Sequence, residues 1–413
     1  MRPDSIDRSV RVPQASRDAG RPLRILTYTT LFPNAAQPAN GIFVENRLRH
    51  LVAGGAVESR VIAPVPWFPS SRPIFGDWAR HAAAPARERR HGLDIDHPRY
   101  PVIPKVGMTA APSLLYAWTV GAARRLQRDW DFDLIDAHYF YPDGVAAAMI
   151  ARRLGKKLVI TARGTDVNLI PSFALPRRQL LWAAGQADHL ITVCEALQTA
   201  LTDLGVPAGK VTVLRNGVDL ESFRPVDRAA ARARLGVEGR VLLSVGHLIE
   251  RKGHHLVIDA LADLPGVTLL IAGSGPEREA LERRSGEAGV AGRVRFLGQL
   301  PHDRLAEIYS AADVLVLASS REGWANVLLE AMACGTPVAA TDVWGTAEAV
   351  TAPEAGLLIP ARSAAAIAST VAALLGALPD RAATRRYAED FSWDDTTRGQ
   401  EALFKEILQR RPS

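Results

Sequence analysis

The sequence of 413 residues has few cysteines and no long apolar run. Its two cysteines, Cys194 and Cys334, lie far apart and have no partner at metal-ligand or redox-motif spacing. We therefore expect structural thiols in a reducing compartment and no disulfide framework. The longest apolar stretch, from about Ala110 to Ala123, is shorter than the roughly 20 residues that a membrane-spanning helix needs. We expect no segment that crosses a bilayer.

The N-terminus also lacks the apolar segment of a signal peptide, because its arginines are interspersed with Asp, Ser and Pro. We expect residues 1–21 to be a disordered tail and the protein to be cytoplasmic. The formal net charge of +6 suits nucleic acid, an anionic membrane surface or a phosphorylated small molecule. No interleaved basic and aromatic residues and no helix-turn-helix pattern occur, so we exclude nucleic acid as a partner. Charge alone does not choose between the other two.

The length favours two domains, and the pattern along the chain agrees. From Arg24, short apolar runs alternate with helix-like stretches, which is the rhythm of βαβ units in an open parallel sheet. Between Pro64 and Pro112 the pattern is lost, and we expect an irregular insertion or a small hairpin region. Turn signals at Asn216-Gly217 and Arg224-Pro225 mark a linker, after which the same rhythm resumes. A final amphipathic helix near residues 396–408 is expected to pack on another surface.

The most informative segment runs from Ser319 to Val338 and reads as strand end, loop, helix, turn and strand. Glu322 is predicted in the loop at the carboxyl edge of the sheet, and Glu330 along the following helix. Both carboxylates can then face one ligand. The free N–H groups at the helix start, near Asn326 and Val327, form a positive end suited to a diphosphate.

This Glu-x7-Glu arrangement, followed by Ala-Met-Ala-x-Gly-x-Pro-Val, resembles the donor site of glycosyltransferase family 4. The resemblance runs from about Leu23 to the C-terminus. It implies retaining enzymes of the α/β GT-B fold, in which two Rossmann-like domains face each other across a cleft. It also implies that Glu322 binds hydroxyls of the transferred sugar and that Glu330 holds the ribose. The expected layout is an acceptor domain over 22–222, a nucleotide-sugar domain over 223–388 and a helix over 389–413 that returns to the first domain.

A second family-like motif spans Ser244 to Gly253, where a strand ends in a basic turn. Lys252 and Arg251 would face the pyrophosphate and neutralise the leaving group, so no metal ion and no other cofactor is strictly required. His247 stands where many relatives have arginine. His247 is expected among the donor-binding residues, and because histidine is often neutral at pH 7, it would lack the fixed positive charge of arginine there.

Further positions follow the family's order. Gly273 begins a glycine turn expected beside the donor, and backbone atoms around Leu300 are expected to read the base. In the first half, Gly41 lies in the glycine loop expected under the diphosphate, where a missing side chain permits close approach. His138 ends a strand at the ligand edge, where the family places a histidine beside the transferred sugar.

Residues Thr161 to Asp166 stand where relatives commonly read His-Gly-x-Asp, with Arg163 in place of the histidine. Arg163 could instead bind an anionic acceptor or a donor phosphate. Asp166 could orient Arg163 or touch the acceptor, and a structural salt bridge is the alternative.

The function predicted from these motifs is transfer of a sugar, with retention, from a nucleotide-diphosphate donor to a saccharide or lipid-linked acceptor. A UDP sugar is the expected donor, and polysaccharide or glycoconjugate synthesis the expected setting. A basic surface from Arg72 to Lys105 would suit an anionic membrane face, or it is a solvated loop. The alternatives are a nucleotide-sugar epimerase of the same fold and a noncatalytic nucleotide-sugar-binding subunit. A nicotinamide dehydrogenase is disfavoured because the first strand is not followed by the dinucleotide fingerprint.

Overall fold

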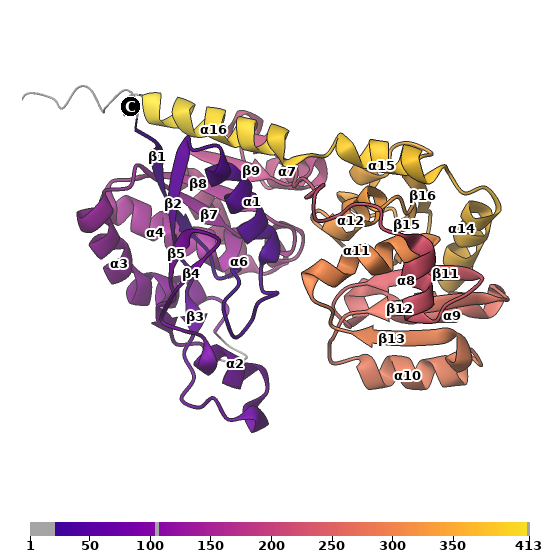
Figure 1. The fold of residues 1–413 in the computed structure, drawn as a ribbon. Coiled ribbons are helices and arrows are strands. Elements are labelled where there is room, and N and C mark those ends of the chain that lie inside the picture. Colours follow the sequence, from indigo (N-terminus) through magenta and orange to yellow (C-terminus); the bar gives the residue numbers. More distant parts are fainter. Residues whose placement is uncertain (1–20, 104–106, 411–413) are drawn as a thin grey trace, which may run out of the picture.

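The computed structural model describes residues 21–103 and 107–410. The predicted disordered tail therefore lies almost wholly outside the described residues, as does Lys105. The described chain forms two Rossmann-like halves, which lie side by side, and after the second half a long C-terminal helix returns and lies along the first (Figure 1).

The first half is built on an eight-stranded sheet with the order β10-β9-β8-β7-β1-β2-β5-β4. All neighbouring strands are parallel except β4 and β5. A separate parallel pair, β3 (Val65–Pro66) and β6 (Arg99–Tyr100), lies in the insertion. The strands of the main sheet are β1 (Leu23–Tyr28), β2 (Val57–Ile62), β4 (Arg87–Arg90), β5 (Leu93–Asp96), β7 (Leu134–His138), β8 (Lys157–Ala162), β9 (His189–Thr192) and β10 (Val211–Val213).

The helices of the first half follow or join these strands. They are α1 (Ile42–Ala53), α2 (Asp77–Ala83), α3 (Ala111–Trp130), α4 (Val145–Leu154), α5 (Thr165–Asn168), α6 (Ala174–Gln186) and α7 (Glu195–Asp203).

The second half has a six-stranded parallel sheet with the order β13-β12-β11-β14-β15-β16. Its strands are β11 (Arg240–Val245), β12 (Val267–Ala272), β13 (Val294–Gly298), β14 (Val314–Leu317), β15 (Val338–Thr341) and β16 (Gly356–Ile359). Its helices are α8 (Arg228–Leu235), α9 (His254–Ala260), α10 (Arg278–Glu287), α11 (His302–Ala311), α12 (Asn326–Ala333), α13 (Thr346–Ala349), α14 (Ala364–Gly376) and α15 (Arg381–Glu389).

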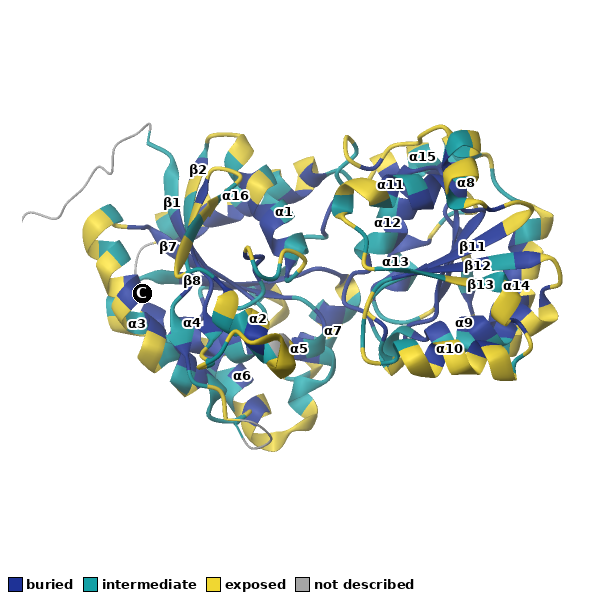
Figure 2. Cartoon of the chain, turned by 60° about the horizontal axis from the view of Figure 1, so that its bottom comes forward, coloured by how far each residue is buried: buried dark blue, intermediate teal, exposed yellow. Residues whose placement is uncertain are grey.

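The central strands are apolar throughout because helices cover both faces of a parallel sheet. Every residue of β7, β9, β14 and β15 is buried, and Figure 2 shows the exposed positions gathered on the outer faces of the helices. In both sheets the strand order reverses at an inner strand, since β1 lies between β7 and β2, and β11 lies between β12 and β14. In open α/β sheets, ligands bind at the carboxyl ends of the strands at such a switch point.

The insertion is more regular than its sequence suggests. Strand β5 pairs in parallel with β2, and β4 folds back on it to extend the main sheet by two strands. In β5, Leu93 and Ile95 are buried while Asp94 is exposed, and this alternation allows one face to join the core. The apolar stretch that begins near Ala110 forms helix α3, with Leu115 and Ala123 fully buried.

The chain passes between the halves twice, and the two crossings lie against each other. The Val218 N–H donates to the carbonyl of Phe391 at 2.9 Å. A Cβ on Gly217 would lie 2.5 Å from the Trp393 nitrogen, so only glycine fits there. Helix α16 (Trp393–Gln409) then packs on α1, burying Phe404 and Ile407 (Figure 1). The end of the chain is thus part of the first half's core.

Candidate active site

The two switch points bring together residues from four strand ends. In the first half, Gly41 lies in the loop after β1 and His138 ends β7. In the second half, Lys252 lies in the turn after β11 and Glu322 in the loop after β14. The two edges meet, because a Cβ on Gly164, which follows β8, would lie 3.0 Å from the Cα of Gly323. The strand-end residues predicted from the sequence therefore lie at facing edges.

Glu322 is held by two groups from its own half. Its Oε1 accepts hydrogen bonds from Lys252 Nζ and from the Ser319 hydroxyl, each at 2.6 Å. Arg251 Nη1 lies 3.5 Å from Oε2 and donates to the carbonyl of Arg321 at 2.8 Å. Burial opposes ionisation, but Lys252 and Arg251 hold the pKa of Glu322 below its usual range. Glu322 is therefore an ionised carboxylate fixed between cations.

Glu330 lies on α12, eight positions further along the chain. The hydroxyl of Tyr309 donates to its Oε2 at 2.7 Å. Burial raises the pKa of Glu330 to about 7, against the opposing effect of that hydrogen bond. The two glutamates thus differ in charge state near neutral pH, although the sequence motif presents them as a pair. Asn326 begins α12, and Val327 beside it is partly buried.

The glycine turns of the second half pack against one another without room for side chains. Gly273 has φ +148°, and a Cβ there would lie 1.8 Å from the carbonyl oxygen of Gly246. Leu300 is partly buried against the core, whereas His247 is exposed on the turn after β11. The strand-end loops after β11, β12 and β13 therefore form one continuous edge.

Gly41 is required by its conformation and by its surroundings. It has φ +66° and immediately precedes α1. A Cβ there would lie 2.2 Å from the carbonyl oxygen of Leu31. The Asn40 side chain fixes the same loop by donating to the carbonyls of Thr30 and Phe32, each at 3.2 Å. The start of α1 is thereby held next to the strand end of β1.

His138 is buried with both ring nitrogens engaged. Its Nε2 lies 3.2 Å from Asp136 Oδ2, and its Nδ1 accepts from Arg163 Nη2 at 2.6 Å. Burial lowers the pKa of His138 to about 4, with Arg163 acting in the same direction and Asp136 opposing. The imidazole is therefore neutral at physiological pH, with its Nε2–H facing Asp136. His138 lies where the sequence places it, and its predicted contact with the sugar stays a prediction.

Asp166 does not pair with the side chain of Arg163, so the salt bridge considered from the sequence is absent. Its carboxylate accepts the backbone N–H groups of Phe140 at 2.6 Å and Gly164 at 2.7 Å, and that of Arg163 at 3.1 Å. The side chain is fully buried. Asp166 thus fixes the two strand-end turns after β7 and β8, because its oxygens satisfy their free amides.

Sequence reasoning missed the residue at the centre of this edge, Asn216, which was identified only as a turn former. Its Oδ1 accepts from Arg163 Nη1 at 3.0 Å and from Arg47 Nη1 at 3.4 Å. Its Nδ2 donates to Asn326 Oδ1 at 3.3 Å, and its carbonyl accepts from the Trp324 indole at 3.0 Å. One side chain in the linker therefore touches both halves of the site.

Two more buried groups complete that network. Arg47 on α1 donates through Nε to Gln400 Oε1 at 2.8 Å, and Gln400 on α16 donates to Asp136 Oδ2 at 2.8 Å. Burial lowers the pKa of Arg47 to about 10 and that of Arg163 to about 9. Arg47 thus reaches Asp136 only through Gln400, and the negative charge of Asp136 opposes the lowering of both arginine pKa values. No local motif in the sequence marks Gln400, which joins the network only through the packing of α16.

Another buried carboxylate of the first half, Asp143, lies in the turn after β7. It accepts the Thr30 N–H at 2.8 Å and the Thr30 hydroxyl at 3.0 Å, which ties the strand ends of β7 and β1 together. Burial raises the pKa of Asp143 to about 7, and the hydrogen bonds from Thr30 oppose this.

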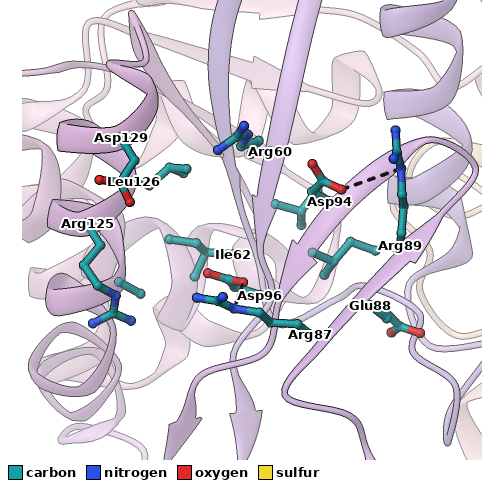
Figure 3. A pocket seen from close by; sticks show the side chains of 13 residues that line it. Arg60, Ile62, Arg87, Glu88, Arg89, Asp94, Asp96, Arg125, Leu126 and Asp129 are labelled. Carbon is teal, nitrogen blue, oxygen red and sulfur yellow. Dashed lines mark ion pairs between the residues drawn. The ribbon is translucent and has the colours of Figure 1, made fainter.

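A cavity of about 440 Å³ lies elsewhere, between the β4–β5 hairpin, β2 and α3 (Figure 3). Two ion pairs lie within its charged lining, with Arg87 Nε 2.9 Å from Asp96 and Arg89 Nε 3.6 Å from Asp94. A second, mainly apolar cavity of about 470 Å³ lies between α4 and α6. Neither contains a residue predicted from the motifs, so neither replaces the strand-end site.

Within residues 21–103 and 107–410, no three His, Cys, Asp or Glu side chains gather in a way suited to a metal ion. In the same part of the chain, no helix combines the length and apolar character needed to span a bilayer.

Comparison with known proteins assigns both halves to one family. The family model described as Glycosyltransferase Family 4 matches residues 78–222. The model described as Glycosyl transferases group 1 matches residues 227–391. A D-inositol 3-phosphate glycosyltransferase of Segniliparus rotundus is 34% identical over 328 residues, covering 72% of this chain and 72% of the relative. A putative teichuronic acid biosynthesis glycosyltransferase of Bacillus subtilis is 29% identical over 358 residues, covering 84% of this chain and 88% of the relative.

Solved structures share the whole architecture. Sucrose-phosphate synthase of Thermosynechococcus elongatus superposes with a TM-score of 0.76 at 23% identity, covering 94% of this chain and 99% of that one. The Anabaena protein HepE, in complex with UDP and glucose, gives a TM-score of 0.71 at 21% identity, covering 93% and 100%. At such identities the likeness shows the fold alone. It confirms the predicted α/β class with two Rossmann-like domains.

Proposed function

Since the chain belongs to glycosyltransferase family 4 and is a glycosyltransferase, we propose that it transfers a sugar, with retention, from a nucleotide-diphosphate donor to a saccharide or lipid-linked acceptor. The observation that carries the proposal is the Glu322–Lys252 pair at the second switch point. An ionised carboxylate that is already hydrogen-bonded to a cation is suited to accept sugar hydroxyls while the cation faces the diphosphate.

In the proposed reaction, the bond between the anomeric carbon and the donor phosphate breaks, and a bond to the acceptor oxygen forms on the same face. Lys252, Arg251 and the N-terminal N–H groups of α12 near Asn326 and Val327 stabilise the negative charge that develops on the leaving diphosphate. The leaving phosphate oxygen takes the acceptor's proton. No metal ion and no other cofactor is required in this scheme, because the protein's own cations balance the charge.

Glu330 is proposed to hold the ribose hydroxyls, oriented by the Tyr309 hydroxyl. Gly273, the backbone near Leu300 and the exposed His247 are proposed to line the nucleotide. Gly41 is proposed to lie under the diphosphate. His138, which is neutral, is proposed to lie beside the transferred sugar as a hydrogen-bonding group, and it takes no part in acid–base chemistry.

A UDP sugar is the proposed donor, in keeping with HepE, which was solved with UDP-glucose. The proposed acceptor carries an anionic group that Arg163 recognises, with Asp166 holding the backbone around it. The names of two relatives, which refer to an inositol 3-phosphate and to teichuronic acid, support this chemistry. We further propose that the protein is cytoplasmic and that the face around Arg72 rests on the inner surface of the membrane.

A calorimetric screen against UDP, GDP and ADP sugars, with and without magnesium, tests the donor first. We expect saturable binding of one UDP sugar without metal, lost in Glu322→Ala and Glu330→Ala and retained in Glu354→Ala, an exposed carboxylate of the same domain. Absence of binding for every nucleotide sugar would overturn the donor assignment. Conversion of the bound sugar without any acceptor would instead indicate an epimerase, and binding without transfer to a full acceptor panel a noncatalytic subunit.

A further inference from the structure

One carboxylate of the second domain reaches into the first. Glu348 lies on α13, and its two oxygens accept the backbone N–H groups of Glu195 and Ala196, each at 3.0 Å. Those amides are the first of helix α7 in the other domain. Arg215, which follows β10 at the start of the linker, donates to Glu348 Oε2 at 2.7 Å through Nη2 and at 3.1 Å through Nε.

The chemistry of this contact favours a persistent bond over an incidental surface pair. The free N–H groups at a helix N-terminus carry partial positive charge, and a carboxylate that accepts two of them is stabilised. The Glu348 side chain is only 16% exposed, which limits screening by water. Arg215 adds a charge-assisted bond and also pairs with Glu195 at 2.8 Å. Glu348 thus joins α7 and the linker in a single cluster.

The same region supports the loop that carries Glu322. A Cβ on Gly345, three residues before Glu348, would lie 2.2 Å from the carbonyl oxygen of Gly323 and 3.0 Å from the Cβ of Cys194. Cys194 directly precedes α7. The Glu322 loop is therefore enclosed between the turn before α13 and the start of α7.

A second tie runs through the linker. The guanidinium of Arg215 lies 5.9 Å from the ring centroid of Trp324, and the Trp324 indole donates to the carbonyl of Asn216 at 3.0 Å. Trp324 is two positions after Glu322. Arg215 thus contacts both Glu348 and the loop whose conformation decides where Glu322 points.

From these contacts we infer that Glu348 is a positioning residue, which latches α13 to α7 and thereby holds the Glu322 loop in its sugar-binding conformation. The inference deepens the proposed function and rests on it for the role of Glu322. The latch acts before any substrate binds, because all of its partners belong to the protein itself. Its loss separates the domains on the linker side and loosens the loop, without removing any group that touches the donor.

The test combines a distance measurement with kinetics. Dyes on A174C in α6 and A280C in α10 report the separation of the domains by single-molecule energy transfer, since both positions are exposed and the two native cysteines are buried. We expect Glu348→Ala to shift the free enzyme to lower transfer efficiency. We also expect an increase in the donor KM of about five- to tenfold, which is within the range by which residues that do not touch a ligand modulate its binding.

Matched variants separate the latch from general damage. Glu348→Gln keeps an acceptor for an α7 amide but loses the charge, so it should fall between the wild type and Glu348→Ala. Glu354→Ala should match the wild type in both measurements. Arg215→Ala should have a smaller effect in the Glu348→Ala background than in the wild type, because the contact that the two residues share is already lost and only the contacts of Arg215 with Trp324 and Glu195 remain.

Unchanged transfer efficiency and donor KM in a folded Glu348→Ala variant would overturn the inference. So would fully additive effects of Glu348→Ala and Arg215→Ala, since residues that share a contact are coupled. A failure of the proposed function is recognised separately: the wild type would bind no nucleotide sugar, while the dye distances would still report whether Glu348 holds the domains.

Discussion

The ammonium of Lys252 lies 2.6 Å from Oε1 of Glu322, which joins the turn after β11 to the loop after β14. The two residues are 70 positions apart in the chain. The side chain of Lys252 is 17% exposed and that of Glu322 is 9% exposed, so the pair is shielded from water but can be reached by a ligand. This geometry suits the proposed roles, in which the carboxylate of Glu322 binds sugar hydroxyls and the ammonium of Lys252 faces the donor phosphate.

Replacing Lys252 by alanine should lower kcat/KM about 100- to 1,000-fold, because it removes a cation from the developing charge of the leaving group. It also removes the larger of the two cationic effects that keep the pKa of Glu322 low, so that pKa should rise. Steady-state kinetics with the donor found by calorimetry provide the measurement. Arg283→Ala, at an exposed position of α10, is the control and should retain full activity. Full activity of Lys252→Ala would show that the leaving group is stabilised elsewhere.

The unfolding free energy should fall as pH rises from about 4.5 to 7, in part because of Glu330. Its pKa is about 7 in the folded chain against 4.5 when unperturbed, so the folded state binds more protons in this window. Glu330→Gln removes this contribution. The unfolding free energy should therefore fall less between pH 5 and pH 8 in the variant than in the wild type, by up to about 2 kcal/mol.

Denaturant unfolding at both pH values measures this difference. The raised pKa of Asp143 also makes the unfolding free energy fall as pH rises. Because Asp143 is present in both proteins, the difference between wild type and variant isolates the contribution of Glu330. The same variant should lose donor affinity, since its amide no longer offers two acceptor oxygens to the ribose. An identical pH slope in wild type and variant would contradict the assignment of the raised pKa.

Gly41→Ala should destabilise the protein by about 3 kcal/mol or more, because its Cβ meets the Leu31 carbonyl oxygen in addition to the strain of positive φ. Gly55→Ala is a matched control. Gly55 has φ +73°, but nothing lies within 4 Å of its Cβ position, so the change should cost only about 1 kcal/mol. Urea midpoints of the two variants give the comparison. Equal losses of stability in the two variants would mean that the loop after β1 shifts to accommodate the added Cβ.

Arg163→Gln should raise the pKa of His138 above its present value of about 4, because a neighbouring positive charge is removed. Asp136→Asn should act in the opposite direction. NMR titration of the ring protons follows both effects, and His302, which lies on α11 in the other domain, should titrate unchanged. If His138 titrates identically in wild type and Arg163→Gln, the contact between Arg163 and its Nδ1 does not govern the histidine.

Much of the fold could be predicted because its signals are local. Buried parallel strands require continuous apolar runs, and the glycines after them are needed where a Cβ would strike a neighbouring carbonyl, as at Gly41 and Gly273. The strand–loop–helix pattern around Glu322 is contained in about 20 consecutive residues, which is why the family could be recognised from it. The sequence predicted only an irregular insertion or a small hairpin region where β4 and β5 extend the sheet, since short polar strands carry a weak pattern.

The sequence by itself determined the two α/β units, their strand-end loops and the residue types that those loops present, because neighbouring residues decide each of these features. Tertiary structure alone decided which distant groups meet. Gln400 contacts Arg47 across 353 positions, Glu348 caps a helix of the other domain, and Asn216 touches both halves of the site. Tertiary structure also sets the opposite pKa shifts of Glu322 and Glu330, since burial and nearby charge depend on packing from many parts of the chain.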